Sequence, residues 1–166
     1  MAIDYYKIFA LPKSYALDAA ALEQNYRRLS TQYHPDKTAH LSAFEQKQAV
    51  MLSATINEAY RILKSPLDRA AFLLQEQGIH ADAPENTRFE PAFLMQQMQW
   101  REDLDDAGHD ENALLALNRQ IVAARDALQA ALNQDFADEQ WENAANHVRE
   151  GRFIHKLLQQ IKQALP

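Results

Sequence analysis

Residues 26–37 have the sequence YRRLSTQYHPDK, and this stretch decides how the first half of the chain folds. Apolar or aromatic side chains recur at helical spacing into and through it, at Leu22, Tyr26, Leu29 and Tyr33. They predict a helix with one apolar stripe. Pro35 ends this helix, because the residue before a proline is pushed out of the α region. The tripeptide His34-Pro35-Asp36 is therefore expected in a loop.

Helix start signals lie on both sides of this stretch. Asp4 can cap a short first helix that ends before Pro12, and Asp18 can cap the next, with Leu17 and Leu22 as a hydrophobic staple. After a loop over residues 37–41, a longer helix is predicted from about 42 to 63. It carries the apolar residues Phe44, Met51, Leu52, Ile56, Ala59, Tyr60 and Leu63. Ser65-Pro66 opens one more short helix.

The second half of the chain predicts three longer helices, at about 91–107, 111–135 and 138–165. Residues 108–110 and 136–137 separate them, and such short connections favour antiparallel neighbours. Residues 78–90 break the periodicity and form the best linker. The sequence thus predicts an all-α fold with domains at 1–77 and 91–166. The first is a helical hairpin with flanking short helices, and the second is an antiparallel three-helix bundle.

Composition excludes several classes of function. With 47% apolar and 24% charged residues, the chain has the make-up of a folded protein. There is no cysteine, which excludes disulfides, thiol nucleophiles and thiolate metal sites. The histidines lack metal-ligand spacing, and no glycine-rich phosphate loop is present. We therefore expect no metal, no cofactor and no catalytic residue. An enzyme that uses the carboxylates of residues 102–106 for acid–base catalysis is a remote alternative, because no paired acid and base is identifiable.

Charge and hydropathy argue against nucleic acid and membranes as binding partners. Residues 84–166 carry the whole net charge of −6, whereas a nucleic-acid-binding protein usually has the opposite bias. The N-terminus does not have the pattern of a signal peptide, and no apolar run approaches the roughly 20 residues needed to cross a bilayer. We therefore expect a cytoplasmic protein that binds neither nucleic acid nor membrane.

The His34-Pro35-Asp36 loop has the chemistry of a contact site for another protein. Pro35 fixes φ and so limits the entropy lost on binding, and Asp36 can accept a charge-assisted hydrogen bond from a partner's arginine. Arg27, Arg28 and Lys37 place positive charge near the loop, which suits an acidic partner. For an isolated tripeptide, the simpler interpretation is a helix stop with a solvated histidine.

The residues that flank the tripeptide favour the contact site over a simple helix stop, because the sequence resembles the J-domain family over roughly its first 75 residues. The matching segments keep the family's order and spacing: Asp4–Ile8, Tyr26–Leu29, Tyr33–Lys37, Ile56–Leu63 and Pro66–Ala71. The resemblance implies that His34, Pro35 and Asp36 dock on a DnaK-type chaperone and stimulate its ATPase. It also implies that Arg27, Arg28 and Lys37 form a supporting basic face, and that Tyr5, Leu29, Tyr60 and Leu63 belong to the core.

The helix predicted at 91–107 carries two stripes on opposite faces. At about 100° per residue, Phe93, Gln97, Trp100 and Leu104 form one stripe, and Leu94, Met95, Met98, Glu102 and Asp106 form the other. The aromatic stripe is the better core candidate by size. The second would then be an exposed Leu/Met patch rimmed by carboxylates, which is typical of a protein-binding surface. Alternatively, both stripes are buried, one of them against the first domain.

The last predicted helix has a long buried stripe, consisting of Trp141, Ala145, Val148, Gly151, Ile154, Leu158, Ile161 and Leu165. Phe153 lies about 100° away from this stripe. Two interpretations stay open for Phe153: a flanking core position, or a contact with a partner.

The arrangement as a whole resembles the HscB family of iron–sulfur cluster assembly, with Phe93-Leu94-Met95 and Arg101-Glu102-Asp103-Leu104 in the second domain. The resemblance implies that this domain binds the scaffold protein IscU and delivers it to the chaperone HscA. The matched positions are Leu94, Met95, Met98, Gln99, Glu102, Asp106 and Phe153. At Gln99 the family carries an acid, so an ionic contact there is in doubt. The alternative within the same class is a J-domain co-chaperone for another client.

Overall fold

The computed structural model describes residues 3–85 and 88–166, and these residues form eight α-helices and no strand. The predicted all-α fold is confirmed. The chain divides into two compact units, Met1–Arg69 and Ala70–Pro166, and the division falls within the fifth helix. Within the described ranges, none of the helices has the length and hydropathy that crossing a bilayer requires.

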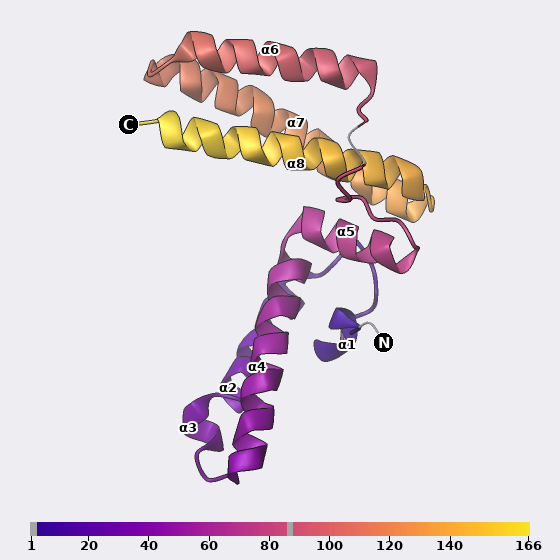
Figure 1. Ribbon diagram of the computed structural model, residues 1–166, viewed down its shortest axis with the longest axis vertical. Coiled ribbons are helices and arrows are strands. Elements are labelled where there is room, and N and C mark those ends of the chain that lie inside the picture. The colour runs from indigo at the N-terminus through magenta and orange to yellow at the C-terminus, as the bar shows by residue number, and fades with distance from the viewer. Residues whose placement is uncertain (1–2, 86–87) are drawn as a thin grey trace. The chain divides into compact units, whose positions relative to one another are not determined.

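The first unit is a helical hairpin with short helices beside it (Figure 1). Helices α2 (Ala19–Gln32) and α4 (Ala43–Lys64) form the hairpin, and α3 (Pro35–Thr38) lies at the turn between them. The short α1 (Tyr5–Ile8) packs on α4, and α5 (Pro66–Glu76) follows it in the chain.

Side-chain caps set the starts of these helices. The carboxylate of Asp4 accepts hydrogen bonds from the backbone of α1, and Asp18 accepts one from the backbone of α2, so both predicted caps are confirmed. Helix α4 begins with a capping box, in which Ser42 and Glu45 each accept from the other's backbone N–H. Those hydrogen bonds from Ser42 hold the pKa of Glu45 below its ordinary value.

The core of the first unit is small and mixes aromatic with aliphatic side chains. Its buried members are Tyr6, Phe9, Tyr15, Leu22, Ala49, Ile56, Ala59 and Leu63. Tyr26 of α2 stacks on Tyr60 of α4 with ring centroids 3.9 Å apart, and its hydroxyl donates to Asn57 at 2.8 Å. Of the four residues expected in the core, Leu63 is buried, whereas Tyr5, Leu29 and Tyr60 are half-buried.

The apolar residues along α4 are not all covered: Phe44, Met51 and Leu52 are exposed, with 69% of Phe44 open to solvent. The helix carries two apolar stripes with the same periodicity. Ala49, Ile56 and Leu63 of one stripe are buried, whereas Phe44 and Met51 lie more than about 100° around the helix from it. Periodicity alone cannot tell which of two such stripes is covered.

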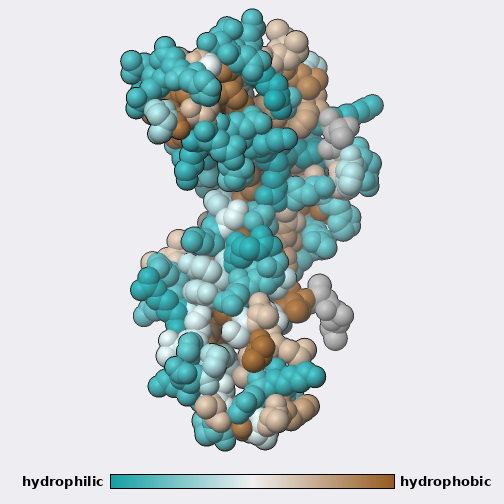
Figure 2. Space-filling view, turned by 60° about the vertical axis from the view of Figure 1, so that its left-hand side comes forward, coloured by the Kyte–Doolittle hydropathy of each residue, from teal (hydrophilic) through white to brown (hydrophobic). Residues whose placement is uncertain are grey.

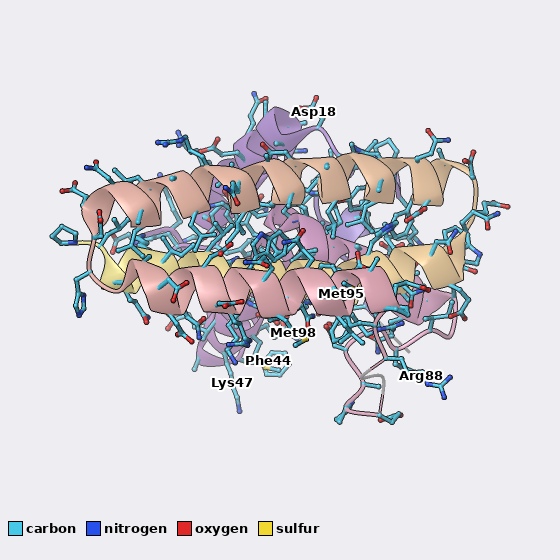
Figure 3. All side chains as sticks on the ribbon, turned by 90° about the horizontal axis from the view of Figure 1, so that it is seen from above. Asp18, Phe44, Lys47, Arg88, Met95 and Met98 are labelled. Atoms are coloured by element: carbon cyan, nitrogen blue, oxygen red, sulfur yellow. The ribbon has the colours of Figure 1, made fainter. Side chains whose placement is uncertain are left out.

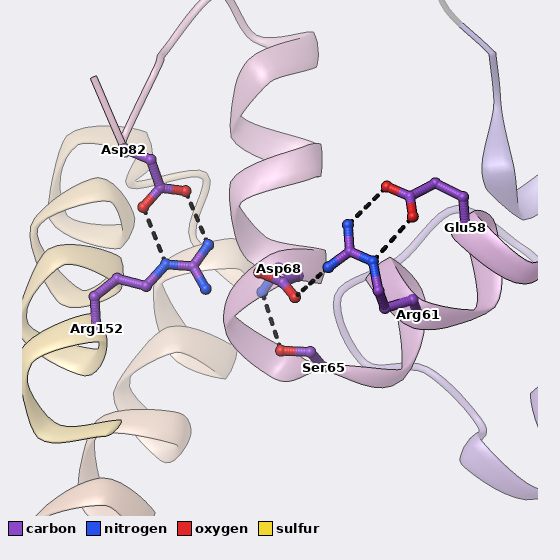
Figure 4. Close-up of polar contacts among 6 residues, drawn as sticks. All are labelled: Glu58, Arg61, Ser65, Asp68, Asp82 and Arg152. Atoms are coloured by element: carbon purple, nitrogen blue, oxygen red, sulfur yellow. Dashed lines mark hydrogen bonds and ion pairs between the residues drawn. The ribbon is translucent and has the colours of Figure 1, made fainter. Parts of the chain in front are cut away.

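A polar cluster fixes the junction of α4 and α5 (Figure 4). Arg61 donates two hydrogen bonds to Glu58 and lies 3.6 Å from Asp68. The hydroxyl of Ser65 accepts from the backbone N–H of Asp68 at 3.4 Å, which confirms Ser65 as the cap of α5. Pro66 occupies the first position of that helix, as predicted.

The second unit contains the three-helix bundle, formed by α6 (Pro91–Ala107), α7 (Glu111–Ala137) and α8 (Trp141–Ala164) (Figure 1). The bundle is confirmed, and the bounds of α6 match the prediction. The predicted connection at 136–137 is wrong, because α7 runs on to Ala137 and the turn comes at residues 138–140. Glu139 adopts a left-handed backbone (φ 55°) there and ends the helix.

The bundle core is mostly aliphatic, with Trp100 as an aromatic member and Asp135 as a buried charged one. Its other members are Ala107, Leu114, Leu117, Ile121, Leu128, Leu132, Ala144, Ala145, Val148, Gly151, Ile154, Leu157 and Ile161. The predicted stripe of α8 differs in detail, because Leu157 is buried whereas Leu158, Trp141 and Leu165 are half-buried. The buried face of α8 is thus broader than a single row at helical spacing, and both Ala144 and Ala145 belong to it.

The described residues of the segment predicted as a linker, 78–90, contact the bundle through an ion pair and a ring contact. Asp82 accepts two hydrogen bonds from Arg152 of α8, at 3.0 and 2.8 Å (Figure 4). The preceding residue, Ala81, is buried, and the ring of Phe89 lies 5.5 Å from that of Phe93. Residues 86 and 87 of the predicted linker lie outside the described residues. The predicted domain bounds at 77 and 90 stay predictions.

Candidate binding surfaces

The His34-Pro35-Asp36 tripeptide forms the start of a helix as well as the end of one. His34 is the N-cap of α3, with an extended backbone (φ −64°, ψ 142°), and its Nδ1 accepts a hydrogen bond from the backbone N–H of Asp36 at 3.2 Å. Pro35 occupies the first position of α3, where its missing N–H costs nothing. The predicted simple loop at 37–41 is therefore partly wrong, because the short helix extends through Thr38.

These local bonds hold the loop in one shape while its side chains face solvent. The side chains of His34 and Asp36 are 59% and 91% exposed. Because Nδ1 of His34 is an acceptor, the neutral ring carries its proton on Nε2, which is then a donor for a partner. The backbone carbonyl of His34 accepts from Lys37 at 2.9 Å. An imidazole N–H and a carboxylate are thus presented together from a fixed backbone.

Three exposed basic side chains lie on the helices on either side of His34: Arg27 and Arg28 on α2, and Lys37 on α3. Arg27 donates to Glu23 one turn earlier at 2.7 Å, so part of its charge is compensated within α2. Within residues 3–85 and 88–166, Arg28 and Lys37 form no ion pair. Exposed, uncompensated cations beside the loop favour an acidic partner.

A second surface lies on the outer side of α6. We call it the α6 surface and define it by Leu94, Met95, Met98, Gln99, Glu102 and Asp106. All six side chains are exposed, and Met95 and Met98 are each 72% open to solvent. Figure 3 shows Met98 on the side of α6 away from α7. Within the second unit this stripe is thus uncovered, and the predicted burial of Trp100 on the opposite face of α6 is confirmed.

Phe153 of α8 lies beside Phe93 and is half-buried. Its ring meets that of Phe93 edge-on with centroids 6.0 Å apart, and the guanidinium of Arg101 lies 5.2 Å from its centroid. Of the two interpretations left open for Phe153, this geometry favours the flanking core position. Its remaining exposed part adjoins α6, so a partner contact is also geometrically open to it.

Sequence reasoning did not single out one exposed apolar group, which lies on α4 of the first unit. Phe44, Val50 and Met51 are each more than 60% exposed, and Phe44 and Met51 border a shallow groove with Lys47 and Gln48. The sequence does contain a pattern that indicates this group, since Phe44 and Met51 are seven residues apart and lie on a separate apolar stripe of the helix. Figure 2 shows that hydrophobic side chains reach the molecular surface in small groups among hydrophilic ones.

Comparisons with known proteins assign both units. Residues 4–72 match the DnaJ domain, and residues 89–162 match the family described as the HSCB C-terminal oligomerisation domain. A His-Pro-Asp loop on a helical hairpin, in a chain that matches the DnaJ domain, defines a J-domain co-chaperone.

Individual relatives cover nearly the whole chain. A co-chaperone protein HscB homologue from Neisseria meningitidis is 51% identical over 97% of this chain and 98% of the relative. One from Bordetella avium is 44% identical over 98% of both. Among solved structures, the chaperone HscB from Vibrio cholerae has a TM-score of 0.84 at 34% identity, covering 97% of this chain and 96% of that one. Human co-chaperone protein HscB has a TM-score of 0.91 at 25% identity, and the match covers 97% of this chain and 81% of the human one. The chain belongs to the HscB co-chaperone family.

Proposed function

We propose that this protein stimulates the ATPase of the DnaK-type chaperone HscA through the His34-Pro35-Asp36 loop and delivers the scaffold protein IscU to it. The α6 surface, with Phe153 beside it, binds the scaffold, and the two activities together assist the maturation and transfer of iron–sulfur clusters in the cytoplasm. The observation that carries the proposal is the exposed loop geometry in a chain of the HscB family.

The loop acts by binding one state of the chaperone better than another. A co-chaperone raises ATP turnover only if it favours the hydrolysis-competent conformation, which requires a difference in binding free energy between two conformations. A loop already held by the His34 cap and Pro35 loses little entropy on docking, so more of its contact energy is available for that difference. Asp36 accepts from a partner's cation, and Arg27, Arg28 and Lys37 contact an acidic region nearby.

The α6 surface suits a folded client with apolar and basic groups. Met95 and Met98 offer flexible, polarizable contacts, and Leu94 adds a branched aliphatic group. Glu102 and Asp106 form an acidic edge that restricts the partner's orientation. Gln99 donates to Asp103 at 2.9 Å, so it contributes a neutral amide where the family carries an acid.

The experiment uses the full chain with purified HscA and IscU from the same organism. We expect the chain to raise steady-state ATP turnover by HscA and, in isothermal titration, to bind IscU with one site. Absence of ATPase stimulation would refute the loop's role. Stimulation without any IscU binding would instead support the alternative, a J-domain co-chaperone for a different client, which a pull-down from cytosol would then identify.

A further inference from the structure

A groove lies between the end of α6 and the start of α7. It has a volume of about 370 Å³ and is open to solvent. The residues that line it are Asp103, Asp106 and Ala107 from α6, and Ala113, Ala116, Leu117 and Gln120 from α7. All of them belong to the second unit, so the groove is a feature of the bundle itself.

The groove combines an apolar floor with an acidic edge. Ala107 and Leu117 are buried at its base, and the small side chains of Ala113 and Ala116 keep it open. The carboxylates of Asp103 and Asp106 stand on its α6 side. This combination matches a lysine or arginine, whose long aliphatic stem packs on apolar surface while its charged end stays near carboxylates and water.

Among the described residues, no cation compensates the negative charge at the groove. In the part of the chain that the structure describes, neither Asp103 nor Asp106 forms an ion pair; Asp103 accepts only from the neutral amide of Gln99, at 2.9 Å. The last turn of α6 contains no basic residue, although a helix C-terminus favours cations. The local charges are therefore unfavourable for the free helix and favourable for a cationic partner group.

The groove continues the α6 surface around the helix. Asp106 belongs to both, and Gln99 of the α6 surface is hydrogen-bonded to Asp103 of the groove. A partner that covers Met95 and Met98 at the usual interface size, about 800 Å² on each side, extends beyond one helix face. Such a partner has a group of its own within reach of the groove.

We propose that the groove between α6 and α7 receives a lysine or arginine side chain of the scaffold protein, so that the scaffold-binding site includes Asp103, Ala113, Ala116 and Gln120. This proposal rests on the proposed scaffold binding by the α6 surface. The stem of the basic residue packs on Ala113 and Ala116, and its cation lies between the two carboxylates. The groove thereby orients the scaffold on α6, in addition to the affinity that the methionines provide.

Two variants of the full chain test the groove, and each has a matched control. Ala116→Leu fills the groove without adding charge, and its control is Ala130→Leu, another alanine on α7 at an exposed position some four turns further on. Asp103→Asn removes one charge, and its control is Asp126→Asn, which removes the same charge from an exposed position on α7. Binding is measured by isothermal titration with purified IscU at two salt concentrations, and folding is checked by thermal unfolding.

We expect Asp103→Asn to weaken IscU binding about fivefold, and its affinity to fall less with added salt than that of the wild type. Ala116→Leu should weaken binding by a similar factor, and both controls should bind as the wild type does. If neither groove variant changes the affinity while Met98→Ala lowers it, the groove proposal is overturned and the proposed function stands. If Met98→Ala also leaves the affinity unchanged, scaffold binding by α6 itself is wrong. Should Ala116→Leu not fold, the affinity and salt dependence of Asp103→Asn decide alone.

Discussion

The His34-Pro35-Asp36 loop and the α6 surface are built in opposite ways. The loop is polar and short, and it is held by bonds among its own neighbours, such as the backbone N–H of Asp36 to the ring of His34. The α6 surface centres on three apolar side chains with an amide and two carboxylates beside them. It extends along a helix of 17 residues and depends on which face of that helix the bundle covers. A compact polar contact suits switching, because few groups must change partners. A broad apolar contact suits holding a client.

This difference predicts that the two surfaces can be disabled separately. The loop belongs to the first unit and the α6 surface to the second, and each is positioned by contacts within its own unit. Substitutions in one should therefore leave the other's activity intact.

The largest effect is expected from His34→Gln. The substitution removes the imidazole that caps α3 and the ring N–H that we propose contacts the chaperone. We expect stimulation of the HscA ATPase to fall about 30-fold or more, equivalent to about 2 kcal/mol, measured as steady-state phosphate release. The matched control is His40→Gln, an exposed histidine of the same unit outside the tripeptide. Equal loss in both variants would show that the tripeptide has no special role.

The next effect is expected on the α6 surface. Leu94→Ala and Met98→Ala should each lower the affinity for IscU by up to about 2 kcal/mol, or about 30-fold, if these residues are binding hot spots. Both side chains are exposed, so the melting temperature should stay near that of the wild type. Leu115→Ala, at a partly exposed leucine of α7, is the control and should leave the IscU affinity unchanged. Isothermal titration measures the affinity, and an unchanged value for both variants would refute the α6 assignment.

Phe153 tests the comparison at a residue that contacts the core and that we propose also contacts the scaffold. Phe153→Ala removes the edge-on contact with Phe93 and the guanidinium contact of Arg101. We expect the free energy of unfolding to fall by about 1.5 kcal/mol, less than for a fully buried phenylalanine, alongside weaker IscU binding. Urea unfolding measures the first and titration the second. Weaker binding with unchanged stability would contradict the flanking core position.

The smallest effect concerns Glu150 on α8. Burial raises the pKa of this carboxyl, and nearby Glu90 raises it further, while His147 and Arg149 lower it in part. Because the folded pKa is raised, Glu150 favours the folded state below its unfolded pKa, near 4.5, and that advantage is lost as the pH rises through the folded pKa. Glu150→Gln should therefore stabilise the bundle at pH 7, by about 0.5 kcal/mol after allowing for solvent screening.

The test for Glu150 is thermal unfolding across pH. The extra stability of Glu150→Gln over the wild type should decrease as the pH falls toward 4.5. Glu142→Gln is the control and should lower the stability instead. Glu142 lies in the first turn of α8, where a negative charge stabilises the helix. A gain from Glu150→Gln that does not depend on pH would contradict the assigned cause.

The same contrast explains what sequence could predict. The caps at Asp4 and Asp18 are local features that can be predicted from neighbours in the chain, and the structure has them where predicted. The helix end before Pro35 was predicted in the same way, but the short helix α3 that begins at Pro35 was not. In α4, two apolar stripes share one period, and the choice between them depends on which helices pack there. The exposure of Phe44 was therefore missed.

In α6 the choice between two stripes could be made, because one contains Trp100 and the other carries carboxylates. The end of α7 could not be placed, since it depends on the left-handed backbone of Glu139, a residue with no special preference for it. The groove lined by Ala113 and Ala116 could not be predicted from the sequence either, because it lies between two helices and depends on how they pack.

One comparison of ATPase rates tests the separation of the two surfaces most directly. Steady-state turnover by HscA is measured without scaffold, with the wild type, with His34→Gln, and with Leu94→Ala combined with Met98→Ala. The account predicts full stimulation by the wild type and by the α6 double variant, and stimulation lowered about 30-fold or more in His34→Gln. Stimulation by His34→Gln near the wild-type level, or its loss in the α6 double variant, would contradict the account.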